Sequence, residues 1–314
     1  MTQRSNTVPP AALGVTAAEV LRRLHAQGAE HPDAPALLHK RGGHWRVFRW
    51  HEVAAEVERL DAALERRGVG AGARIALSGP FEPDLITFAL AAHARGVLLH
   101  PVAPSLQGDG LAGVLAAIAP THAFVQGRRT IARWLTVRPG GGTAAVPLLT
   151  SLPLGPPHPG PWRIDPLWPD EADDHGRRHW IGRVQALGRR DILWADEGTE
   201  WAGGLGAIIA PWLAGGTVVA FPEAAGSAAR DRREIRPTAL LASPERHRAI
   251  AEEILRRLPP PGSLGRRVHD ALTANPAGVA ARLVTARLNA LLGLRRSLEP
   301  AARTPGAVPE GAAP

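Results

Sequence analysis

Hydrophobic positions along the chain alternate between helical spacing and short apolar runs. The clearest helical case is Val53, Val57, Leu60 and Leu64, which recur at intervals of four, three and four residues. Similar patterns predict helices at about residues 20–28, 84–95, 111–118, 201–213, 245–258 and 279–292. Short apolar runs predict strands at residues 36–38, 47–48, 74–77, 97–99, 123–125, 217–221 and 239–241. This alternation predicts an α/β fold with a parallel, doubly wound sheet.

One segment, residues 138–174, is rich in Pro and Gly and shows little periodicity, which is typical of a connector. The expected organisation is a disordered lead-in (1–15), a first α/β subdomain (16–137), this connector, a second α/β subdomain (175–298) and a disordered tail (299–314).

No transmembrane segment is expected. The uncharged stretch Gly203–Phe221 approaches the roughly 20 residues of a membrane span, but its glycines and Pro211 divide it into a helix, a turn and a strand. Residues 1–10 are polar and show no signal-peptide pattern, and the chain has no Cys. A cytoplasmic location is therefore expected.

The net charge of +8 raises the question of nucleic-acid binding, since clustered cations gain affinity by releasing counterions from phosphates. Of the 37 basic residues only Lys40 is a lysine, so 36 are arginines (37 − 1). Most arginines lie near Glu or Asp on predicted helices, a pattern typical of solvated helix faces. Nucleic-acid binding remains an alternative, but the distribution does not favour it.

Three other patterns are weak indicators of a site. Gly68–Ala73 spells a dinucleotide-binding motif, but it follows a helix and precedes a strand, the reverse of what such a site requires. His175 and His179 with nearby aspartates are candidate metal ligands on a helix, although a solvated polar loop is the preferred interpretation. The basic helix at 279–292 suits core packing with a solvated rim better than a membrane surface or a partner.

Several segments, in order, resemble the adenylate-forming (AMP-dependent) acyl-CoA synthetase superfamily, and most closely its long-chain acyl-CoA synthetases. They cover roughly residues 16–298. The matching segments are His31–Leu37, Trp50–Val53, Leu64–Leu77, Glu82–Pro101, Trp212–Val219, Arg233–Thr238, Ser243–Arg246 and Leu292–Arg296. The resemblance implies the fold of the N-terminal domain of these enzymes. It also suggests Trp201, Ser243 and Pro244 as candidate acyl-pocket residues.

Enzymes of this family join a carboxylate to AMP and then pass the acyl group to coenzyme A, using ATP and Mg²⁺. The resemblance places a phosphate-binding loop rich in Ser, Thr and Gly before Asp191. This chain has instead Asp170–His179, with four carboxylates and no Ser, Thr or Lys. A carboxylate cluster repels a triphosphate. The family's nucleotide motif and catalytic lysine are also not found, so no cofactor and no catalytic residue is predicted.

The sequence therefore favours a non-catalytic homologue of these ligases that binds an acyl group or a protein partner. The first alternative is one subunit of a split acyl-CoA or acyl-AMP ligase, whose second chain supplies the missing motifs. The second is a basic nucleic-acid-binding protein.

Overall fold

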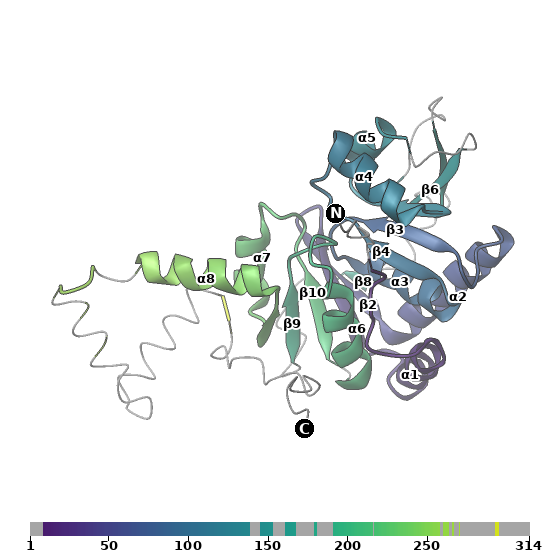
Figure 1. The fold of residues 1–314 in the computed structure, drawn as a ribbon. Helices are drawn as coiled ribbons and strands as arrows, with labels where there is room; N and C mark the ends of the chain where they lie inside the picture. Colours follow the sequence, from purple (N-terminus) through teal and green to yellow (C-terminus); the bar gives the residue numbers. More distant parts are fainter. Residues whose placement is uncertain are drawn as a thin grey trace, which may run out of the picture.

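The strands of this protein form two sheets that are separated and flanked by helices (Figure 1). The computed structural model describes residues 9–138, 145–152, 161–167, 179–180, 191–215, 217–257 and 260–263, together with residues 266, 270, 293 and 294. The two parallel-dominated sheets confirm the predicted α/β class.

The six-stranded sheet has the order β11-β9-β10-β1-β2-β8. Its strands are β1 (Pro35–Arg41), β2 (His44–Arg49), β8 (His179–Trp180), β9 (Ile192–Ala195), β10 (Val218–Phe221) and β11 (Ala239–Leu241). The first four strands in this order run parallel, while β2 and β8 pair antiparallel.

The five-stranded sheet has the order β4-β3-β5-β6-β7 and is parallel throughout. Its strands are β3 (Arg74–Ser78), β4 (Leu98–Pro101), β5 (His122–Val125), β6 (Val146–Thr150) and β7 (Trp162–Pro166). The chain passes from β3 to β4 on one side and then to β5 on the other. In doubly wound sheets, ligands bind outside the carboxyl ends of the strands where the order reverses in this way.

Helices lie between the sheets and on their outer faces. The inner layer consists of α1 (Ala17–Glu30), α2 (Trp50–Arg66), α3 (Pro83–Ala94) and α6 (Gly204–Gly215). The outer faces carry α7 (Ala228–Ile235) on the six-stranded sheet and α4 (Gly108–Ile118) with α5 (Arg128–Leu135) on the five-stranded sheet. The last helix, α8 (Pro244–Arg257), begins beside α7 and runs outward from the body (Figure 1).

Successive residues of the strands pack into different hydrophobic cores, because side chains alternate between the two faces of a sheet. On β1, Leu37 packs into the core between the sheets and Leu38 into the core beneath α7. On β3, Leu77 and Ala76 divide in the same way between the central core and the core beneath α4 and α5. Both faces are buried, which explains why these strands read as continuous apolar runs.

Aromatic pairs join the inner helices to each other and to a sheet. Trp50 of α2 stacks on Trp212 of α6 with ring centroids 4.8 Å apart, and Phe88 of α3 stacks on Phe124 of β5 at 3.9 Å. The indole N–H of Trp212 donates to the carbonyl of Ala36 at 3.1 Å, so its one polar group is satisfied inside the core.

The segment interpreted as a Pro/Gly-rich connector, 138–174, contains strands β6 and β7, which complete the five-stranded sheet. These two strands were not predicted, because Pro147 and Pro166 fall within their short apolar runs. Strands β1 and β2 also pair with β10 and β8, which come from beyond this segment. The predicted boundary at 138–174 therefore does not coincide with the boundary between the sheets.

The lead-in was expected to be disordered as far as residue 15, and this is wrong for residues 9–15. Leu13 is buried in the central core, and Ala11 N donates to Leu99 O of β4 at 2.6 Å. A Cβ at Gly206 of α6 would lie 2.3 Å from Ala12 O, so the segment lies directly on the helix backbone there. A glycine in α6 thus makes room for the lead-in.

Other expectations have mixed outcomes. The stretch Gly203–Phe221 forms α6 and β10, and none of the described helices is long and apolar enough to cross a membrane. Helices α5 and α7 were not expected. The helix predicted at 279–292 and the tail expected at 299–314 lie outside the described residues.

Candidate functional site

The carboxyl ends of the two sheets meet at a six-residue segment after β9, Asp196–Trp201, here named the junction loop. Gly198 of this loop forms an isolated β-bridge with Pro80, which follows β3 of the other sheet. A Cβ at Gly198 would lie 2.5 Å from Gly79 O, so a larger residue would separate the two backbones. The loop therefore lies where α/β proteins bind ligands.

Thr199 fastens the junction loop to the five-stranded sheet. Its backbone N–H donates to Gly79 O at 3.0 Å, and its Oγ1 accepts from Gly79 N at 3.0 Å. The same hydroxyl donates to Val102 O, just after β4, at 2.7 Å. Since Thr199 is buried, each of these hydrogen bonds satisfies a group that water does not reach.

An aromatic pair forms one end of the junction loop. Trp201, which is partly exposed, packs edge-to-face on Phe81 with ring centroids 6.4 Å apart. Both rings lie against the backbone of α6: a Cβ at Gly204 would be 2.4 Å from Phe81 and 2.9 Å from Trp201. The pair offers an apolar surface next to the backbone of the strand ends.

Two carboxylates form the other end of the loop and bind the start of α8. Glu197 accepts from Ser243 N and from Ser243 Oγ, both at 2.6 Å. Asp196 Oδ2 lies 2.8 Å from Arg246 Nη2 and 3.8 Å from Arg232 Nη1. Burial lowers the pKa of Arg232, whereas the hydrogen bond with Asp196 raises the pKa of Arg246.

Comparison with known proteins finds a family match over part of the chain. Residues 24–152 match the family described as AMP-binding enzyme. A 98-residue part, 28% of the chain, is 35% identical to acetoacetyl-coenzyme A synthetase of Rhizobium meliloti (strain 1021). The chain matches only 15% of the length of that synthetase.

Solved structures share the fold of a larger part of this chain. VinN has a TM-score of 0.52 at 16% identity, covering 79% of this chain and 66% of its own. A protein named as a putative long-chain-fatty-acid CoA ligase of Rhodopseudomonas palustris CGA009 has a TM-score of 0.51 at 20% identity. The match covers 76% of this chain and 66% of that protein. The N-terminal subdomain of NpsA from Klebsiella oxytoca has a TM-score of 0.50 at 17% identity. The match covers 74% of this chain and 62% of that subdomain. At these identities the likenesses show the fold alone, and they agree with the predicted α/β fold class.

The candidate acyl-pocket residues lie at or near the two ends of the junction loop. Trp201 is the last residue of the loop, and Ser243 is joined to it through Glu197. Pro244 is exposed at the first position of α8. Their role in holding an acyl group stays a prediction. Glu197 and Thr199, which hold the loop, were not predicted; the only signal was a polar, glycine-containing run directly after a short apolar segment.

The single lysine of the chain lies on the face of the six-stranded sheet that α7 covers, and it is engaged in ion pairs. Lys40 Nζ donates to Asp231 Oδ1 at 3.0 Å and to Glu234 Oε2 at 2.5 Å. Its side chain is 4% exposed. Burial lowers the pKa of Lys40, but the hydrogen bonds and charges of the two carboxylates outweigh burial and raise it.

The weaker candidate sites have clear positions. Gly68–Ala73 lies between α2 and β3, so it does not lead from a strand into a helix. His179 lies in strand β8 opposite Val47, so it is not on a helix as the metal-site hypothesis required. His175 lies outside the described residues. Within the described ranges, His, Asp and Glu side chains nowhere form a group of three suited to a metal ion.

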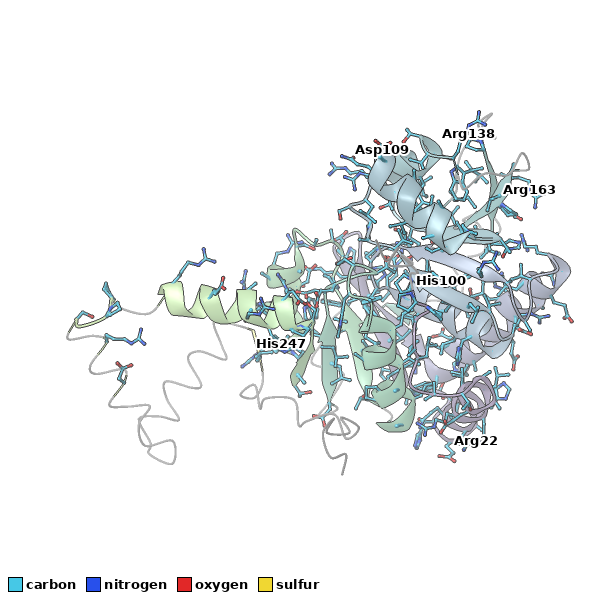
Figure 2. The ribbon with its side chains drawn as sticks, viewed as in Figure 1. Arg22, His100, Asp109, Arg138, Arg163 and His247 are labelled. Carbon is cyan, nitrogen blue, oxygen red and sulfur yellow. The ribbon has the colours of Figure 1, made fainter. Side chains whose placement is uncertain are left out.

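The labelled side chains in Figure 2 show how polar groups are distributed over the fold. His100, on β4, lies within the body of the molecule, whereas Arg22, Asp109 and Arg138 lie at its periphery. Many arginines of the described ranges pair with nearby carboxylates, as Arg95 does with Asp61 at 3.0 Å. Such pairs reduce the positive charge available to a polyanion.

Proposed function

We propose that this chain binds the acyl group of a carboxylic acid or acyl thioester at the junction loop and does not itself form acyl-adenylates. The observation that carries the proposal is the partly exposed Trp201 packed on Phe81 at the carboxyl ends of both sheets. Apolar side chains beside a few fixed polar backbone groups are typical of small-molecule sites. The backbone beside the pair is fixed here by the bridge between Gly198 and Pro80 and by the bonds of Gly79 to Thr199.

The state of Lys40 supports the non-catalytic part of the proposal. A lysine that stabilises a transferring phosphoryl group must present its ammonium to the nucleotide. Lys40 is held by Asp231 and Glu234 on the face of the sheet covered by α7, and freeing it would leave the buried Asp231 with only the exposed Arg230 as a charged partner, at 3.5 Å. The residues that the structure describes therefore offer ATP no lysine.

The segment Asp170–His179 gives further support from sequence. The resemblance places the phosphate loop there, and four carboxylates in ten residues oppose a triphosphate. Apart from histidines, the cations of this segment are arginines, and a guanidinium does not reproduce the geometry of an ammonium.

Binding is tested by titrating the full chain with acetoacetate, octanoate and palmitate and following heat or thermal shift. The panel spans the acyl sizes named by the Rhizobium synthetase and the Rhodopseudomonas ligase. Trp201→Ala is expected to weaken binding at least tenfold. Leu98→Ala, an exposed apolar residue at the opposite end of a strand, is the matched control and is expected to bind normally. No binding across the panel would contradict the proposal.

Catalysis is tested by ATP–pyrophosphate exchange with the same acids. Exchange is expected to stay at background, and exchange well above background would overturn the non-catalytic assignment. Exchange that appears only when a second, separately encoded chain is added would favour the split-ligase alternative. Retention on heparin that falls steeply with salt would instead favour the nucleic-acid alternative.

A further inference from the structure

Helix α8 is attached to the body near its start. Among its described side chains, Arg246 reaches Asp196 and Ile250 packs at the edge of the core beneath α7, while Ser243, just before the helix, binds Glu197. Beyond this first part the helix runs outward (Figure 1). Two of the three attachments therefore depend on adjacent residues of the junction loop.

Glu197 controls the cap of α8. Ser243 Oγ donates its hydrogen to Glu197, which leaves its lone pairs free to accept from Arg246 N at 3.0 Å. This second bond satisfies an amide in the first turn that has no partner within the helix. The carboxylate also places negative charge at the helix N-terminus, where it is favourable.

The backbone between Glu197 and Trp201 has little freedom to move independently. Glu197 O accepts from Phe81 N at 3.0 Å, and the next residue, Gly198, lies against Gly79 without room for a Cβ. Thr199 then makes its three bonds to the other sheet. A shift of Trp201 must move these contacts together or break them.

We propose that the junction loop couples the position of Trp201 to the capping of α8, so that a ligand at the acyl site changes how stably the first turn of α8 is held. Displacement of Trp201 from Phe81 pulls on Thr199 and Gly198, withdraws Glu197 from Ser243 and loosens the first turn of α8. The inference rests on the proposed function for its ligand, but the coupling itself is a property of the loop.

The coupling is tested without ligand by hydrogen exchange of the full chain. Thr199→Val removes the side-chain bonds to Gly79 N and Val102 O but touches nothing in α8. Exchange of the α8 amides is expected to rise roughly three- to tenfold, the change that corresponds to losing about one net hydrogen bond. Amides of α4 are expected to exchange as in the wild type.

The matched control is Thr87→Val, which removes a buried hydroxyl that donates to Pro83 O within α3, away from the loop. It accounts for general destabilisation and is expected to leave the exchange of α8 relative to α4 unchanged. Wild-type exchange of α8 in Thr199→Val, or an equal rise in both variants, would overturn the coupling.

A second arm adds octanoate to the wild type and follows Trp fluorescence, with Trp201→Phe identifying the signal of Trp201. A fluorescence change accompanied by faster α8 exchange supports the coupling. A fluorescence change with α8 exchange unaltered overturns it. If octanoate changes neither, the proposed acyl site fails for this ligand, and the Thr199→Val comparison alone decides the coupling.

Discussion

Lys40 Nζ lies 3.0 Å from Asp231 Oδ1 and joins strand β1 to helix α7 across 191 residues of sequence. Asp231 is completely buried and also accepts from Ser227 Oγ at 2.5 Å and from Glu223 N at 3.1 Å. Burial raises the pKa of Asp231, but these hydrogen bonds and the charge of Lys40 outweigh it and lower the pKa. The lysine is therefore the countercharge of a buried carboxylate.

Replacing Lys40 with Met is expected to destabilise the protein by about 3–5 kcal/mol, because it removes the buried countercharge of Asp231 and leaves only the exposed Arg230, 3.5 Å away. Urea unfolding measures the loss. The double variant Lys40→Met with Asp231→Asn is expected to recover part of it, since the buried charge is then gone. A loss below about 1 kcal/mol in the single variant, the range of an exposed pair, would contradict this role.

Local patterns in the sequence predicted most of the helices and strands, because apolar spacing reports which face of an element is buried. They did not predict which strands pair. The pairing of Leu37 on β1 with Val219 on β10 joins residues that local periodicity does not relate. Helix α7 was missed because its eight residues are mostly charged, and its inner face includes the buried Asp231 and Arg232.

The candidate site was predicted only at its two ends. Trp201 and Ser243 stood out through the resemblance, whereas Glu197 and Thr199 act through contacts that sequence does not display. The bond from Ser243 to Glu197 spans 46 residues, and the bond from Gly79 to Thr199 spans 120. A glutamate or threonine in a loop carries no mark of such a partner.

Asp165 on the edge strand β7 gives the protein an acid-sensitive contact. Arg67, at the end of α2, binds it through two hydrogen bonds of 2.9 and 2.8 Å, and the bonds from Arg67 lower the pKa of Asp165 below 3.8. A lowered pKa contributes stability above the unfolded value that is lost as the pH falls through the folded value. Asp165→Asn is therefore expected to reduce the loss of unfolding free energy as the pH falls below 3.8, as measured by urea titrations at a series of pH values.

An unchanged pH profile in that range would contradict the assignment. Asp109→Asn is the matched control, since Asp109 is exposed in the first turn of α4. It removes a carboxylate without this arginine pair.

His122 is expected to act in a second, higher pH range. Burial lowers its pKa below 6.5, and the nearby charge of Arg163 lowers it further. The unfolded chain then takes up a proton before the folded protein does, so stability is present above pH 6.5 and decreases below it. His122→Gln is expected to remove this decrease between pH 6.5 and the acid range of Asp165, as measured by urea unfolding at a series of pH values. A decrease that persists unchanged would assign it to another group.

Gly206 tests whether the lead-in is an integral part of the fold. Its missing side chain leaves room for Ala12 O, and a Cβ there would lie 2.3 Å from that oxygen. Gly206→Ala is expected to push residues 9–15 off α6 and to cost about 1–3 kcal/mol, the usual range for overpacking.

Gly113→Ala in α4, where a Cβ meets nothing within 4 Å, is the control and is expected to be neutral or stabilising by about 0.4–1 kcal/mol. Faster proteolysis near Leu13 in the first variant alone would show that the segment has detached, because this buried residue must leave the central core to reach a protease. Equal proteolysis in both variants would mean that α6 accommodates the methyl group by a local shift.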